Sequence, residues 1–269
     1  SHFAIASPTY SDLLKNSWQG GDSGLAVTLV GGRPILKKVV PGSPAYKAGL
    51  RVGYQIVSVN GESFANLKKT VESSGVFKNV IPFYLEKSVE NRWYGSLGES
   101  VELVAKSGAF GTSKRYAFKL RTYEGLMSEQ LGNFGTMPME IETRILEGEV
   151  AYLRFDIWFP GLMVAMRNFV RSLGDDVSGL VIDVRGNPGG IGLMATGLAG
   201  MLVDEEFRMG TMRMRSGFLN FNVFPQKGAF LGPVAVLIDG SSISTSEIFA
   251  ASMQETGRAR VFGSKSPGA

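Results

Sequence analysis

The sequence has no cysteine among its 269 residues and a single histidine. The absence of cysteine excludes a thiol nucleophile, a zinc–thiolate site and disulfides, and it leaves the redox compartment undetermined. No stretch reaches the roughly 18 apolar residues that a membrane-spanning helix needs. The longest candidate, residues 191–203, is interrupted by glycine and is better interpreted as a buried helix. A membrane span is therefore not expected.

Charged residues are few and evenly spread, with 28 basic and 24 acidic side chains giving a formal net charge of +4. Because no basic block is present, nucleic acid is not an expected partner. The hydrophobic fraction of 44% indicates a folded globular chain, and the length suffices for two modest domains. The chain starts at Ser1 without a methionine or a signal peptide and stops in a loop-like stretch, so we expect a processed, trimmed or partial sequence.

The first folded region is predicted over residues 21–124 as a series of short strands and turns. Alternating apolar residues predict strands over 25–30 and 34–40 and a third strand that ends in a tight Asn60-Gly61 turn. Residues 67–73 have helical spacing, whereas 74–97 have no clean period and are predicted to be an irregular insertion. Two more strands, 100–105 and 116–121, are predicted to complete the region.

This region resembles a PDZ domain of the bacterial, protease-associated kind, and the residues that carry the resemblance are Ser23-Gly-Leu-Ala26, Pro41-Gly-Ser-Pro-Ala45, Ala48-Gly-Leu50 and the strand and turn from Gly53 to Gly61. The resemblance implies that peptide C-termini add a strand at a sheet edge. The backbone amides of Gly24, Leu25 and Ala26 would receive the carboxylate. The alternative is that the domain is a rigid spacer.

The second region alternates strands with helices. Residues 125–138 are aperiodic and predicted to be a linker. Strands are then predicted over 139–146, 150–157, 178–184 and 234–238, and helices over 162–173, from 191 to 202 and over 247–256. The stretch before 234 is rich in Met, Phe and Arg and less regular. This alternation favours a mostly parallel sheet covered on both faces.

Two loops that follow buried strands, residues 185–190 and 240–246, are candidates for chemistry. Ligands bind at the carboxyl ends of strands in open α/β sheets, so both loops could face one crevice. A serine between a buried strand and a helix start is well placed as a nucleophile, because unpaired N–H groups and the helix dipole favour negative charge there. The alternative is that the hydroxyl residues between 241 and 246 are turn and capping residues.

A second resemblance rests on three segments, Leu180-Val-Ile-Asp-Val-Arg-Gly-Asn-Pro-Gly-Gly190, Ser242-Ile-Ser-Thr-Ser-Glu-Ile-Phe-Ala250 and Gly257-Arg-Ala-Arg-Val-Phe-Gly263. Together they resemble the core of the C-terminal processing peptidases, serine peptidases related to the tricorn protease core, many of which carry a PDZ domain. The resemblance implies Ser244 as the nucleophile, with Ser242 and Ser246 as neighbouring alternatives. It implies an oxyanion hole made by the N–H of Thr245 and of Gly189 or Gly190.

We therefore predict an α/β peptidase core, with a mostly parallel sheet flanked by helices of the ClpP-like or crotonase-like type, plus a mainly-β PDZ domain. The predicted boundaries are an N-terminal segment of the peptidase region over 1–20, the PDZ domain over 21–124 with an insertion at about 74–97, a linker over 125–138, and a C-terminally truncated peptidase core over 139–269.

The general base is the point at which this chain departs from the family. The processing peptidases use a lysine in a Phe-Gly-Lys run, but Pro267-Gly268-Ala269 stands at that place and Lys265 is four residues early. A Ser-His pair upstream of the PDZ domain in the tricorn branch resembles Ser1-His2. This resemblance implies that His2 is the base, that Ser1 orients it, and that an acidic partner lies beyond residue 269. The alternative is that Ser1-His2 is a tag remnant or a frayed terminus.

The predicted function is serine endopeptidase activity through an acyl-enzyme, with no metal or cofactor required. Unfolded or C-terminal peptide segments are the expected partners, and the family resemblance implies an extracytoplasmic, periplasmic or secreted, location. Two alternatives differ in class. The chain could be a catalytically inactive PDZ scaffold, or a binding protein that holds an apolar ligand around residues 209–224.

Overall fold

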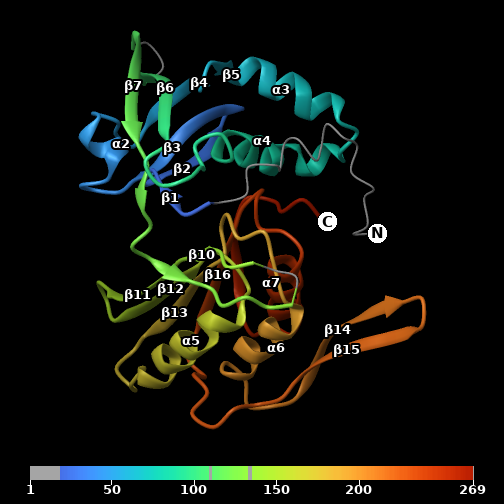
Figure 1. The fold of residues 1–269 in the computed structure, drawn as a ribbon. Coiled ribbons are helices and arrows are strands. Elements are labelled where there is room, and N and C mark those ends of the chain that lie inside the picture. Colours follow the sequence, from blue (N-terminus) through green and yellow to red (C-terminus); the bar gives the residue numbers. More distant parts are fainter. Residues whose placement is uncertain (1–18, 109–110, 133–134, 269) are drawn as a thin grey trace. The chain divides into compact units, whose positions relative to one another are not determined.

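The computed structural model describes residues 19–108, 111–132 and 135–268. The chain forms two compact units, residues 1–124 and 125–269, and each is described by itself (Figure 1). The predicted Ser1-His2 pair lies outside the described residues, and so does Ala269.

The first unit is built on an antiparallel sheet with the strand order β2-β3-β4-β6-β7, in which β5 also pairs with β4. A separate short pair joins β1 to β8. The strands are β1 (Gly21–Asp22), β2 (Leu25–Val30), β3 (Arg33–Val39), β4 (Tyr54–Val59), β5 (Glu62–Ser63), β6 (Ser100–Ser107), β7 (Ser113–Lys119) and β8 (Arg121–Thr122). The helices are α2 (Pro44–Lys47), α3 (Phe64–Ser73), the 3-10 turn η1 (Lys78–Val80) and α4 (Ile81–Glu90).

Alternation along the strands builds the core of this unit. In β6, Val101, Leu103 and Ala105 are buried while the residues between them are half-buried, as a strand with one face on the core requires. The predicted Asn60-Gly61 turn is confirmed, since both residues have positive φ (48° and 81°), the conformation that a tight hairpin turn needs.

The prediction of an irregular insertion over 74–97 is wrong, because α4 occupies its middle. Leu85, Val89 and Trp93 are buried at four-residue spacing along one side of this segment. Glu86 and Glu90 are buried as well, at 8% and 6% exposure. Buried carboxylates beside buried apolar residues remove the contrast from which a helical period is recognised.

The second unit is built on a five-stranded sheet with the order β11-β12-β13-β16-β17. The first pair is antiparallel and the other three pairs are parallel. The strands are β11 (Ile141–Leu146), β12 (Val150–Phe155), β13 (Gly179–Asp183), β16 (Val234–Ile238) and β17 (Arg260–Gly263), and the short β9 (Leu126–Met127) pairs with β10 (Pro138–Met139). The helices are α5 (Pro160–Ser172), α6 (Gly192–Gly200) and α7 (Thr245–Glu255).

Buried apolar residues from the sheet and the three helices form one core, which includes Leu153, Leu162, Ile182, Leu198, Val236 and Phe249. The predicted strand over 234–238 is confirmed at its bounds. No helix of the described residues is long and apolar enough to cross a membrane.

The Met-, Phe- and Arg-rich stretch without a regular period forms an antiparallel hairpin, β14 (Phe207–Met214) and β15 (Gly217–Val223). Its base packs on the unit, where Phe221 and Val223 are buried and Ser252 Oγ of α7 donates to the Met209 carbonyl at 2.8 Å. Its far end extends away from the helices and sheet of its unit (Figure 1). The irregular pattern has a structural reason, because only one half of the hairpin has a core to face.

Candidate active site

The two loops singled out in the sequence are bound to each other in the structure. β13 and β16 are parallel neighbours, so the loops that follow them leave the same edge of the sheet. Asp239 Oδ1 accepts the N–H of Gly186 at 2.9 Å, and Ser242 Oγ donates to the Val184 carbonyl at 2.8 Å. The same Asp239 oxygen accepts the Ser241 N–H at 2.9 Å. These bonds hold the turn after β16 against the glycine loop.

Ser244 lies at the sharp turn between β16 and α7, and its backbone is strained. Its φ is 56° and its ψ is −116°, a conformation that residues with a side chain rarely adopt. The Glu247 carboxylate holds the turn by accepting the Ser244 N–H at 2.9 Å. A strained turn from strand to helix that carries a partly exposed serine is the geometry of a nucleophile elbow.

The two alternative serines have structural roles. Ser242 is fully buried, and besides its bond to Val184 its hydroxyl accepts the Asp239 N–H at 2.9 Å. Ser246 is also fully buried; its hydroxyl accepts from Trp158 Nε1 at 2.9 Å and donates to the Asn187 carbonyl at 3.0 Å. Both hydroxyls therefore satisfy buried polar groups, which is the usual role of a buried serine.

The two glycines beside Ser244 differ in burial and in their hydrogen bonds. Gly189 is buried with φ +101°, and a Cβ built on it would lie 2.9 Å from Ser244 Cβ and 3.1 Å from Thr245 N. Its N–H already donates to Asn187 Oδ1 at 2.9 Å. Gly190 is exposed, and its carbonyl accepts from Thr245 Oγ1 at 2.9 Å. Within the described residues, the N–H groups of Gly190 and Thr245 make no hydrogen bond.

Asp183, at the end of β13, is a buried site residue that the sequence reasoning missed. Its carboxylate accepts from the Arg185 N–H at 3.0 Å and from Arg185 Nη2 at 2.6 Å, and from Tyr152 Oη at 2.7 Å. Burial by itself would raise the pKa of Asp183, but the bonds from Arg185 and Tyr152 and the nearby Arg154 lower it to about 2. The carboxylate is therefore ionised at neutral pH, and it fixes the start of the glycine loop. The sequence feature that could have pointed to Asp183 is the run Asp183-Val-Arg185 at the end of a buried strand.

Among the described residues, no basic side chain is hydrogen-bonded to Ser244 Oγ, and Lys265 is exposed. The tail after β17 does reach this region, since the Gly268 N–H donates to Glu247 Oε1 at 2.5 Å. His2 and Ser1 lie outside the described residues, so their placement stays a prediction.

In the first unit, two of the three amides predicted to receive a peptide carboxylate, those of Gly24 and Leu25, have partners of their own. The Gly24 N–H donates to Asp22 Oδ1 at 2.8 Å, and the Leu25 N–H donates to Ser23 Oγ at 3.2 Å. Asp22 also pairs with Arg121 at 3.2 Å. A bound tail would have to replace the Asp22 carboxylate at this turn.

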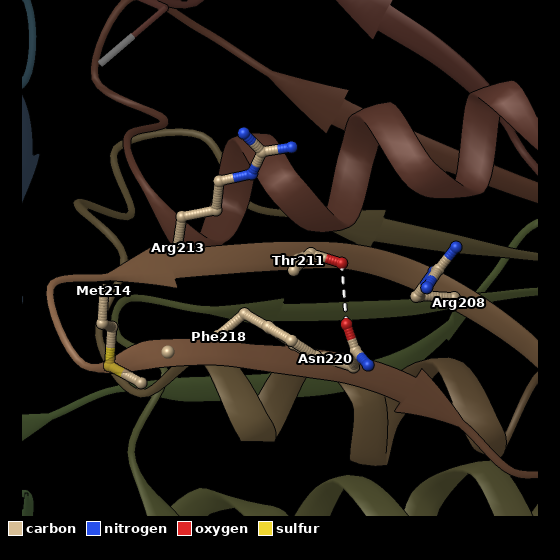
Figure 2. Close-up of a pocket in the computed structure, with 7 residues that line it drawn as sticks. Arg208, Thr211, Arg213, Met214, Phe218 and Asn220 are labelled. Atoms are coloured by element: carbon tan, nitrogen blue, oxygen red, sulfur yellow. Dashed lines mark hydrogen bonds between the residues drawn. The ribbon is translucent and has the colours of Figure 1, made fainter.

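A hollow on the β14–β15 hairpin bears on the alternative of an apolar-ligand site (Figure 2). Thr211 and Asn220 line it from the two strands, and Thr211 Oγ1 donates to Asn220 Oδ1 at 2.8 Å. The hollow is open to solvent, and its lining residues Met214 and Phe218 are exposed. Two arginines, Arg208 and Arg213, line it as well. An open hollow with charged walls does not favour an enclosed site for an apolar ligand.

Comparison with known proteins agrees with both units. Residues 149–269 match the model of peptidase family S41, and residues 35–73 match the model of the PDZ domain. The carboxy-terminal processing protease CtpB of Bacillus subtilis is 29% identical over 266 residues, which cover 96% of this chain and 48% of that protein. The carboxyl-terminal-processing protease of Picosynechococcus is 25% identical over 237 residues, covering 85% of this chain and 49% of that protein.

The solved photosystem II D1 C-terminal processing protease shares the fold, with a TM-score of 0.56 and 20% identity over 98% of this chain and 66% of that one. This chain spans about half the length of the curated relatives that it matches. Residues 149–269 are therefore similar to peptidase family S41 and residues 35–73 to the PDZ domain, and the relatives that match nearly the whole chain are carboxy-terminal processing proteases.

Proposed function

We propose that this chain is a serine endopeptidase that hydrolyses peptide bonds through an acyl-enzyme on Ser244. The observation that carries the proposal is the strained Ser244 turn, at a helix start and beside Gly189. Strain at a single non-glycine residue persists only where the surrounding structure enforces it, and such residues cluster at active sites. The names of the homologues, which are processing proteases, support the same reaction.

In the proposed mechanism, Ser244 Oγ attacks the peptide carbonyl carbon and gives its proton to the base. The N–H groups of Thr245 and Gly190 are the proposed donors to the oxyanion that forms, because neither is engaged elsewhere in the described structure. The Gly189 N–H is bonded to Asn187, so it is not proposed as an oxyanion donor. We propose instead that Gly189 is needed because it has no side chain, which leaves room next to Ser244.

We infer that His2 is the general base and then the general acid for the leaving amine, with Ser1 orienting the imidazole and an acidic partner beyond residue 269. The support is chemical. The family's lysine position is occupied by Ala269, and a neutral imidazole can accept a serine proton near pH 7. Substrate tails are proposed to bind at the PDZ domain, and the location is proposed to be extracytoplasmic. The sheet of the second unit, with three parallel pairs, supports the predicted ClpP-like or crotonase-like topology.

Turnover of an unstructured, internally quenched peptide tests the nucleophile. Ser244→Ala is expected to lower kcat/KM at least about 1,000-fold, as loss of a serine nucleophile does elsewhere. Ser264→Ala is the matched control, because Ser264 is an exposed serine in the tail after β17 and should leave turnover unchanged. Equal turnover by the parent and the Ser244→Ala variant would refute the proposal.

The base is tested in the same assay with His2→Gln and Lys265→Gln. Loss of turnover with the first change alone supports His2. Loss with the second change alone would show that the assignment to histidine is wrong.

A further inference from the structure

The free edge of the PDZ sheet is already occupied by side chains of α4. β2 is the edge strand in the described sheet, and its N–H groups at Val27 and Leu29 point away from β3. The Val27 N–H donates to Glu90 Oε1 at 3.4 Å, and the Leu29 N–H donates to Glu86 Oε1 at 2.9 Å. These are the two donors with which an added peptide strand would pair.

The geometry of this contact follows from two regular spacings. Four residues of helix advance about 6 Å, which matches the roughly 6.6 Å that two residues of strand advance. Glu86 and Glu90, one helical turn apart on α4, therefore reach alternate N–H groups of β2. Thr28 adds a bond by donating its Oγ1 to Glu86 Oε1 at 2.9 Å.

The carboxylates of Glu86 and Glu90 are both buried, so their stability depends on the groups that bond to them. Glu90 also accepts from Lys87 Nζ at 2.8 Å. Burial by itself would lower the pKa of Lys87, but attraction to Glu90 raises it on balance, so the ammonium stays charged. A buried carboxylate that loses its hydrogen-bond donors is strongly disfavoured unless another positive group replaces them.

We propose that Glu86 and Glu90 act as an internal ligand of the β2 edge, and that the external ligand of this edge is an extended peptide with Lys or Arg at two alternate positions. The carbonyl groups of such a peptide would take over the Val27 and Leu29 N–H groups. Its alternate side chains lie on one side about 6.6 Å apart, and they would return a cation to each displaced carboxylate. This inference rests on the proposed peptide-binding role of the PDZ domain.

Fluorescence anisotropy tests the proposal with the whole chain in a Ser244→Ala background, so that the probe is not cleaved. Two labelled peptides of equal length with free C-termini are compared, one with lysine at two alternate positions and one with alanine there. The parent chain is expected to bind the lysine peptide at least about tenfold more tightly, since each pair is charge-assisted. In Glu86→Gln/Glu90→Gln this preference should vanish, and the alanine peptide should bind about fivefold more tightly because amide oxygens are weaker acceptors.

Glu72→Gln/Glu147→Gln is the control, since both residues are exposed and the double change removes the same two negative charges. Amide hydrogen exchange gives a readout without any peptide. The Val27 and Leu29 N–H groups should exchange at least about fivefold faster in the double variant, with no change at Ile56 of the inner strand β4.

Unchanged exchange at Val27 and Leu29 in a folded double variant would overturn the internal-ligand assignment. A parent chain that binds both peptides equally would leave the peptide-binding role standing and would refute the preference for basic residues. If neither peptide binds to either form, both the inference and the peptide-binding role fail, whereas peptide hydrolysis by the chain with Ser244 intact is measured separately and stands on its own result.

Discussion

Replacing Ser244 by glycine should stabilise the protein relative to replacing it by alanine, although both changes remove the nucleophile. The two variants lose the same hydroxyl group, and both keep the backbone N–H that donates to Glu247. They differ in that glycine adopts φ 56° and ψ −116° without steric cost, whereas alanine retains the strain of its Cβ.

The size of the difference follows from two opposing effects. A residue with a side chain in such a region costs about 1–3 kcal/mol of backbone strain. Glycine also makes the unfolded chain more flexible, which lowers stability by about 0.4–1 kcal/mol. The net expectation is that Ser244→Gly is more stable than Ser244→Ala by about 1 kcal/mol. In a domain of this size that difference corresponds to a Tm higher by about 2–4 °C.

Differential scanning calorimetry of the two variants measures this directly, and the transition of the peptidase unit is the one to compare. The matched control is the same pair of changes at Ser172, near the end of α5. Its backbone is helical, so the order should reverse and glycine should be the less stable by about 0.5–1 kcal/mol. A Ser244→Gly variant that melts at or below Ser244→Ala would show that the turn stores no strain, and the main support for Ser244 would be lost.

Two further predictions concern the buried groups that hold the loops. Ser246→Ala removes the acceptor of Trp158 Nε1 and the donor to Asn187, so the free energy of unfolding should fall by about 2 kcal/mol in urea titration; an unchanged midpoint would contradict this role. Asp183 has its pKa lowered from 3.8 to about 2, so its charge contributes about 2 kcal/mol above pH 4, and this is lost as the pH falls toward 2. Asp183→Asn should therefore destabilise the protein more at pH 7 than at pH 3, and an equal loss at both values would refute the assignment.

Much of the fold could be predicted because its signals are local. The strand over 234–238 is a short apolar run followed by turn residues, and the Asn60-Gly61 turn has the dipeptide that its backbone requires. The loops after β13 and β16 were recognisable for the same reason. The helix α4 and the β14–β15 hairpin were missed, because a period is visible only where buried positions are apolar and exposed positions are polar. In α4 the charged residues Glu86 and Glu90 are buried, and in the hairpin the apolar residues Met212 and Phe218 are exposed, so neither element shows that pattern.

The sequence by itself determined the order of the elements, the two loops of the site and the run of hydroxyl residues that contains the proposed nucleophile. The family resemblance already favoured Ser244 over Ser242 and Ser246. Only the tertiary structure shows that the hydroxyls of Ser242 and Ser246 bind buried polar groups, and that Gly189 and Gly190 differ in the bonds of their N–H groups. The physical reason is that these residues differ in their partners and not in their type. Ser246 is occupied by Trp158, 88 residues away, and Glu86 bonds Leu29, 57 residues away. Periodicity and turn chemistry act over a few neighbouring residues, whereas the partner of a buried hydroxyl, amide or carboxylate is chosen by packing between distant segments of the chain.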